Sequence, residues 1–349
     1  MGTAKRIDYI DLAKGICILL VVWMHVVPEL GKGNPLMVNL RMPLYYFLSG
    51  MFFKTYGNFR NFIVKKTDKL LIPFIAWYLI SYGIYYARVL AIGHPEHVFN
   101  ITDLFLDSEF YNGSIWFLLS LLWCNIIYFA INSVSSKEIV RLSFVIIIAL
   151  SGWIYSYSDI GNFLYIGTSL TSLPFFYMGK QMVKYGVVSQ NKRIKEDLIV
   201  GFICLLVAIM AITIPTDSPR MIFYLNLMEA GNPIFLYLSG LSLILFVLII
   251  CKYINRLPYV SYLGRFSIIV LVTHKLLQNI FTRFIEHTTG IEVDNLRGHI
   301  ILFCVIIALM GVIIPICRRF LPYVCAQKSL LEDKILKKPE PRLLETNRS

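Results

Sequence analysis

Charged residues are scarce in this sequence. Asp, Glu, Lys and Arg make up 15% of the 349 residues, whereas hydrophobic residues make up 57%. A soluble domain uses roughly 25% charged residues to cover its core with polar surface. The composition therefore excludes an ordinary soluble globular protein, and lipid is the solvent that suits this chain.

Several motifs of hydrolytic and metal chemistry are also missing. The sequence has no GxxxxGK[ST] phosphate loop, no HExxH zinc helix and no GxSxG nucleophile elbow. Its seven cysteines form no CxxC pair, so we expect neither a disulfide framework nor a metal cofactor. These absences disfavour nucleotide hydrolysis, zinc catalysis and serine-hydrolase chemistry.

The basic residues do not follow a nucleic-acid-binding pattern. The formal net charge is +12, yet Lys and Arg occur in short clusters between apolar runs and form no continuous basic face. We therefore exclude nucleic acid as a partner and interpret the charge as a topology signal.

Long apolar runs fill most of the chain. Each is long enough to cross roughly 30 Å of hydrocarbon as a helix. The sequence therefore predicts an all-α, polytopic integral membrane helix bundle of about ten transmembrane helices in the lipid bilayer of the cell membrane. The expected spans are 9–28, 38–54, 70–90, 115–132, 140–156, 162–182, 198–215, 233–251, 266–282 and 299–317.

The connections between these runs alternate in charge. Most of the 33 Lys and Arg residues fall in every second connection and near the two ends of the chain. Because cytoplasmic loops carry the excess of positive charge, both termini are predicted to be cytoplasmic. Residues 1–320 are expected to form the membrane-embedded domain, and residues 321–349, with the stretch KKPEPR, a short solvated tail.

The first span carries three ionisable residues in an otherwise apolar helix, Asp11, Lys14 and His25. At about 100° per residue all three share one face, and Lys14 and His25 differ in depth by about 16 Å. Ionisable residues inside a membrane are functional by default, so this face is the predicted chemical centre. The alternative is a buried ion pair and a hydrogen-bonded histidine that only pack the helix.

Two further residues are expected near the depth of His25. Arg41 stands at the start of the second span, which a short loop connects to the first. It is either an electrostatic partner of His25 or a snorkelling arginine that reaches the headgroups. His274, in the ninth span, would either orient an acceptor hydroxyl or satisfy a packing hydrogen bond.

Lysines gather before the third span, and aromatic rings gather at the span ends. Lys65, Lys66 and Lys69 form a compact site for several phosphate charges, unless they only anchor the chain at the cytoplasmic face. Trp116 is one of the aromatic residues at the span ends, most of which serve as headgroup anchors.

Six sequence blocks follow one another along the chain: IDYIDLAKGICILLVVWMH, RMPLYYFLSGMFF, the basic stretch before LLIPF, SIWFLLSLL, LPFFYMGKQM and YLGRFSIIVLVTHKLL. Together they resemble acyltransferase family 3, multispanning enzymes that acylate sugars and other extracytoplasmic acceptors. The most specific block is a basic residue followed by ten others and a histidine, here Lys14 to His25.

Within that family the IDxAKG opening is most similar to the fucose 4-O-acetylase-like group. Two positions depart from the pattern. Arg41 stands where that group usually has histidine, and Lys66 and Lys69 stand where the family has an arginine pair.

The resemblance implies a membrane O-acyltransferase, with acetyl as the expected acyl group. The acyl group would pass from cytoplasmic acetyl-CoA, or another acyl-CoA, to a hydroxyl of an extracytoplasmic sugar or cell-surface polysaccharide. In that scheme Lys66 and Lys69 hold the CoA phosphates, Lys14 and Asp11 line the donor path, and His25 is the general base.

The remaining residues would bind substrate or cofactor. Arg41 would stabilise the developing oxyanion, and Trp116 and His274 are expected to contact substrate. A covalent acyl-enzyme relay stays open beside direct transfer.

The main alternative is a transporter or flippase for a glycan or a lipid-linked intermediate. It would also use many helices, intramembrane charges and basic inner loops, but it predicts repeated halves with broken helices, and the sequence shows no internal repeat. A non-catalytic scaffold is a third interpretation, which leaves the face from Lys14 to His25 without a purpose.

Overall fold

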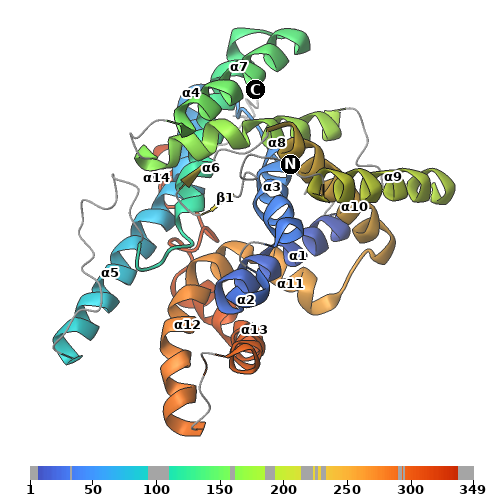
Figure 1. The fold of residues 1–349 in the computed structure, drawn as a ribbon. Coiled ribbons are helices and arrows are strands. Elements are labelled where there is room, and N and C mark those ends of the chain that lie inside the picture. Colours follow the sequence, from blue (N-terminus) through green and yellow to red (C-terminus); the bar gives the residue numbers. More distant parts are fainter. Residues whose placement is uncertain are drawn as a thin grey trace, which may run out of the picture.

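The fold is built almost entirely from α-helices, so the predicted all-α class is confirmed (Figure 1). A short antiparallel pair, β1 (Phe223–Tyr224) and β2 (Leu227–Met228), is the exception among the described residues. The computed structural model describes residues 7–31, 34–92, 110–157, 162–184, 193–213, 223–224, 227–228, 233–289, 293 and 295–336.

Each predicted span overlaps one long helix. Figure 1 shows α1 and α3 in the middle of the molecule, with α5, α7, α9 and α12 extending away from it. The long helices are α1 (Asp8–Val26), α3 (Pro35–Met51), α5 (Ile72–Ile92), α6 (Trp116–Val134), α7 (Glu138–Ser156), α8 (Ile166–Lys184), α9 (Ile194–Thr213), α10 (Pro233–Ile254), α12 (Ser267–Thr289) and α13 (Leu296–Phe320).

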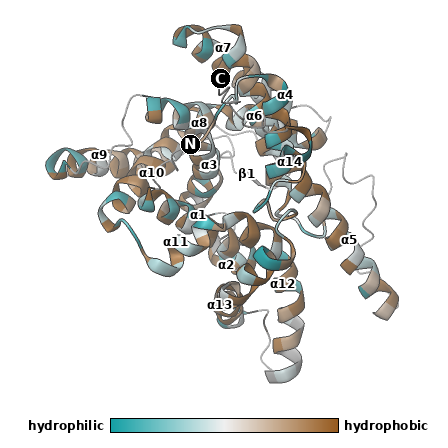
Figure 2. Cartoon of the chain, turned by 180° about the vertical axis from the view of Figure 1, so that it is seen from behind, coloured by the Kyte–Doolittle hydropathy of each residue, from teal (hydrophilic) through white to brown (hydrophobic). Residues whose placement is uncertain are grey.

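Shorter helical segments connect them. Hydrophilic residues gather around α4 and α14, whereas the long helices are largely hydrophobic (Figure 2). These segments are α2 (Pro28–Gly31), α4 (Phe59–Lys66), the π-helix η1 (Thr67–Leu71), the 3-10 helix η3 (Phe163–Tyr165), α11 (Pro258–Arg265) and α14 (Glu332–Ile335).

Asparagine side chains start several helices. Asn34 accepts a hydrogen bond from the backbone N–H of Leu36 at the start of α3, and Asn58 accepts one from Asn61 at the start of α4. Asn295 starts α13 in the same way. Each cap satisfies an N–H group that the first helical turn leaves without a partner.

Seven helices in the described part of the chain are long and apolar enough to cross a membrane, or eight if the bent pair α11 and α12 counts as one span. The chain is therefore a multi-pass membrane protein. The predicted spans at α3 and α8 are not among them. α3 has 17 residues, and α8 carries polar residues such as Ser169 and Thr171, both fully buried. Interior helices face protein, so they need less apolar surface.

Glycines allow the interior helices to approach closely. A Cβ at Gly50 of α3 would overlap the backbone carbonyl of Phe176 in α8, and one at Gly179 would overlap that of Phe47. Such small residues let backbones pack directly against each other in membrane proteins. The α3–α8 pair is thereby held as a tight unit beside α1.

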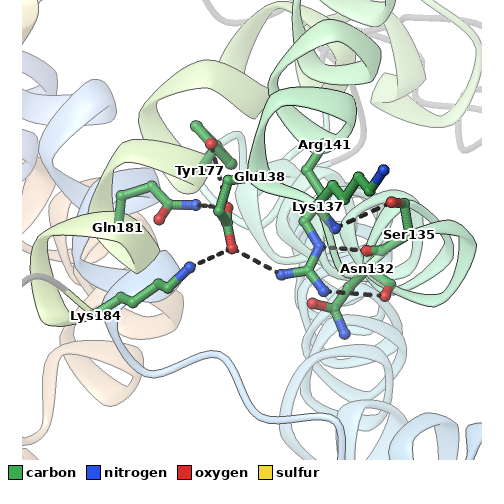
Figure 3. Close-up of polar contacts among 8 residues, drawn as sticks. All are labelled: Asn132, Ser135, Lys137, Glu138, Arg141, Tyr177, Gln181 and Lys184. Carbon is green, nitrogen blue, oxygen red and sulfur yellow. Dashed lines mark hydrogen bonds and ion pairs between the residues drawn. The ribbon is translucent and has the colours of Figure 1, made fainter.

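A charged cluster joins the adjacent ends of α7 and α8 (Figure 3). The carboxylate of Glu138 accepts hydrogen bonds from Lys184 at 2.6 Å, from Arg141 at 3.0 Å and from Gln181 at 2.7 Å. Arg141 also donates from Nε to the carbonyl of Ser135 at 2.7 Å. One acid thus pairs with a basic residue from each of the two helices that it links.

The chain after α13 packs back onto the bundle as far as residue 336. The indole of Trp77 donates to the carbonyl of Val324 at 3.1 Å. The buried carboxylate of Asp68 accepts the backbone N–H groups of residues 330–332 at 2.7–3.0 Å. The sequence predicts a solvated tail here, but it could not reveal this distant partner. Residues 337–349 of that tail lie outside the described residues.

Candidate active site

A cavity of about 380 Å³ lies between α1, α3, α6, α12 and the π-helix. Lys14, Lys66 and Lys69 line it, and we call it the lysine cavity. Among the described residues, no carboxylate contributes to its wall. A space of this size and charge suits a polyanionic group.

The π-helix sets the position of two of these lysines. α4 ends at Lys66, and the wider turn Thr67–Leu71 carries Lys69 before α5 begins. Asp68 lies between them in sequence but is buried against the C-terminal segment. Single π turns inside α-helices are frequent at functional sites. Here the π-helix contributes Lys69 to the cavity wall but keeps the carboxylate of Asp68 out of it.

Tyr56 adds a hydroxyl to the lysine cavity. Its φ of 56° is unusual for a bulky residue, and such conformations cluster at functional sites. Partial burial raises the pKa of Tyr56 above its usual value, although nearby Lys65 opposes the change. The side chain is therefore a neutral phenol at physiological pH and can donate a hydrogen bond.

A broken helix forms another part of the wall. α11 and α12 meet at an angle of 91°, and Ser267, the first residue of α12, lines the lysine cavity. The start of a helix carries partial positive charge, which favours anions. Broken helices inside a membrane bundle are tolerated where they line a cavity.

A smaller cavity of about 20 Å³ adjoins the lysine cavity. His25 of α1, Arg41 of α3 and Trp116 of α6 line it, and we call it the histidine chamber. Arg41 is 2% exposed and Trp116 is 4% exposed. The ring of Trp116 stacks on Tyr165, with centroids 5.4 Å apart. Three of the predicted site residues thus line one space.

His274 lies beside this chamber and is fully buried. Its ring centroid is 5.3 Å from that of His25. Nδ1 of His274 lies 2.9 Å from the carbonyl of Val270, which favours the tautomer that donates from Nδ1. Nε2 has no hydrogen-bond partner among the described residues. Gln278 donates to the backbone carbonyl of His25 at 2.9 Å, which links α12 to α1.

Asp11 is the predicted site residue that the structure places elsewhere. It is buried where α1 meets α11, and its carbonyl lies against Gly264. It does not line the lysine cavity, whereas Lys14 does. The half-helix α11, which the sequence does not predict as a separate element, covers that end of α1.

Two hydrophobic residues of the site are missed by sequence reasoning. Phe117 of α6 and Leu271 of α12 line both cavities. Nothing distinguishes them from other apolar residues of their spans. Phe117 stands next to Trp116 in the SIWFLLSLL block, but that adjacency alone does not identify a junction.

The family model of acyltransferase family 3, described as an acyltransferase domain, matches residues 7–318. The chain belongs to acyltransferase family 3. This protein is therefore an enzyme that transfers acyl groups other than amino-acyl groups. In this acyltransferase, the match includes every residue that lines the two cavities. No curated protein and no solved structure matches the chain.

Proposed function

We propose that this acyltransferase moves an acetyl group from cytoplasmic acetyl-CoA to a hydroxyl of an extracytoplasmic sugar or cell-surface polysaccharide. The observation that carries this proposal is a pair of adjoining cavities with different chemistry. The lysine cavity suits the anionic donor, and the histidine chamber suits a reacting hydroxyl.

The donor end rests on charge. CoA carries several phosphate charges, and Lys66 and Lys69 supply cations to bind them. Tyr56 and the start of α12 add neutral donors to the same wall. Lys14 lines the same cavity from α1, the helix that continues to His25. The phosphopantetheine arm would then extend toward the histidine chamber.

The acceptor end rests on the two histidines and Arg41. His25 would take the proton of the acceptor hydroxyl as its oxygen attacks the thioester carbonyl. The new C–O bond forms, the C–S bond breaks, and the proton passes from His25 to the CoA thiolate. Arg41, which lines the same chamber, would stabilise the oxyanion of the intermediate. An acyl-histidine relay would use the same residues in two steps.

His274 would position the acceptor. Its Nδ1 is engaged by Val270, and Nε2 is the remaining acceptor beside His25. A second hydroxyl of a sugar could donate to that nitrogen. The ring of Trp116, stacked on Tyr165, is also part of the chamber lining.

The family match favours this enzyme over the transporter and scaffold interpretations. We place it in the cell membrane with both termini in the cytoplasm, so that the lysine cavity faces the acetyl-CoA pool. We propose that it acts as members of the fucose 4-O-acetylase-like group do.

Mass analysis of cell-surface glycans tests this proposal. Glycans from cells with the wild-type protein should carry an acetyl ester that is absent from cells that lack it. Complementation with His25→Ala should leave the ester absent, whereas His299→Ala, a histidine change outside both cavities, should restore it. Identical glycans with and without the protein would contradict the proposed acceptor class.

A further inference from the structure

The two cavities meet at a pair of apolar side chains. Phe117 and Leu271 line both the lysine cavity and the histidine chamber, and they are the residues that the two linings share. Phe117 is 4% exposed and Leu271 is 5% exposed. We call this pair the collar. A thioester that reaches from the lysine cavity toward His25 would lie against these two side chains.

The space beyond the collar is small. The histidine chamber has a volume of about 20 Å³, whereas the lysine cavity has about 380 Å³. About 10–15 Å³ of such volume holds one water molecule. Val21, Met24 and Met42 are further apolar residues of the chamber lining. A chamber of this size fits a reacting carbonyl and its methyl group better than a longer acyl chain, with the body of the acceptor sugar outside it.

The aromatic side of the collar is supported by its neighbours. The ring of Phe117 packs against Tyr45 and Tyr46 of α3, with centroids 5.3 and 5.2 Å away. Both tyrosines are buried. Rotation of the Phe117 ring would displace these side chains, and packed interiors resist such shifts.

Hydrogen bonds hold the two sides of the collar together. The hydroxyl of Ser114 donates to the carbonyl of Leu271 at 2.7 Å, and Asn112 donates to the carbonyl of Val272 at 2.8 Å. The side-chain oxygen of Asn112 lies 2.9 Å from the same Ser114 hydroxyl. The turn before α6 is thereby fixed to α12 next to Leu271.

We infer that the Phe117–Leu271 collar selects the acyl group by length, admitting acetyl and rejecting longer chains. The inference rests on the proposed function, because it assumes that a thioester enters from the lysine cavity. The bonds made and broken are those of that reaction, and the collar contributes only steric selection. A longer acyl chain would leave its carbonyl short of His25.

Competing acyl donors test the collar. Purified wild-type enzyme would be assayed with acetyl-, propionyl- and butyryl-CoA on a glycan extract from cells lacking the enzyme. We expect acetyl transfer and little butyryl transfer. Phe117→Ala and Leu271→Ala should raise the butyryl-to-acetyl rate ratio by about tenfold or more, since one methylene in a tight pocket changes rates at least that much.

Leu121→Ala is the matched control. Leu121 is buried and lines the lysine cavity without lining the histidine chamber. This change should leave the ratio close to that of the wild type. A variant that merely loosens the fold would lower all rates alike, so the ratio separates selection from stability. Phe117→Leu, a milder change, keeps the test informative if an alanine variant fails to fold.

The failures are distinguishable. If the wild type transfers acetyl but the collar variants leave the ratio unchanged, or if the wild type transfers butyryl as fast as acetyl, the collar is overturned and the proposed function stands. If the wild type transfers no acyl group from any of these thioesters, the proposed function falls and the collar falls with it.

Discussion

At the scale of single residues, Lys14 and His25 divide the site between them. They stand on one helix, yet Lys14 lines the lysine cavity and His25 lines the histidine chamber. Eleven residues of helix rise by about 16 Å. A donor with an anionic end and a distant reactive thioester matches this separation. Helical phase makes this part of the site predictable from the sequence.

Replacing Lys66 and Lys69 together by alanine should weaken acetyl-CoA binding. Hydrogen bonds to charged groups contribute about 1.5–3 kcal/mol each, and solvent screening reduces that value. We therefore expect the Kd for acetyl-CoA to rise by about tenfold or more. Thermal stabilisation of the purified protein, measured over a range of acetyl-CoA concentrations, gives the Kd.

Acetyl-pantetheine serves as the control ligand, because it carries the thioester without the phosphates. Its affinity should be the same in the wild type and the double variant. Lys137→Ala removes an exposed lysine outside both cavities and should change neither affinity. An equal loss of affinity for acetyl-CoA and acetyl-pantetheine in the double variant would contradict a phosphate-binding role.

At the scale of helices, the sequence predicts which segments are helical better than it predicts where a helix is broken. Long apolar runs form helices because lipid offers no hydrogen-bond partner to the backbone, so the backbone groups must bond within the segment. The bend of 91° before α12 follows from contacts that a single sequence does not reveal, such as Gly264 packing on the backbone of α1. Pro258 and Gly264 in one short stretch are the signal that could have suggested it.

The segment after α13 should detach when Asp68 is replaced by alanine. The change removes three backbone hydrogen bonds to one carboxylate. We expect a local loss of about 1–3 kcal/mol. Alkylation of Cys325, which is fully buried, should become faster. The alkylation rate of Cys325 in the wild type is the reference, and unchanged protection of Cys325 in the variant would contradict this anchoring.

Gly50→Ala should destabilise the protein. The added methyl group would overlap the backbone of Phe176, so α3 and α8 would have to separate. Overpacking of this kind costs about 1–3 kcal/mol. Gly83→Ala is the control, because a Cβ there meets nothing within 4 Å. Thermal unfolding in detergent should show a lower midpoint for Gly50→Ala only, and equal midpoints would argue against tight α3–α8 packing.

At the scale of the whole molecule, the site is assembled from helices far apart in the chain. The short connection between the first two spans makes the proximity of His25 and Arg41 predictable. Phe117 of α6 and Leu271 of α12 line the same cavities. Hydropathy does not predict that these two helices are neighbours. The burial of Asp11 is not predictable for the same reason, because α11, which covers it, lies about 250 residues further along the chain.

The enzyme has one cavity for each of its two proposed substrates. The lysine cavity would receive its donor from one side of the membrane, and the histidine chamber would meet its acceptor from the other. One bundle could then bring together substrates that a bilayer keeps apart.

The most direct test is acetyl transfer in membrane vesicles with the cytoplasmic face outward and acetyl-CoA supplied outside. His25→Ala should lower the transfer rate by about 10²–10⁴-fold, as loss of a general base does, while thermal stabilisation by acetyl-CoA persists. His299→Ala, whose imidazole pairs with Glu29 away from the cavities, should retain the wild-type rate. A His25→Ala enzyme that still transfers acetyl at the wild-type rate would contradict the assignment of the histidine chamber.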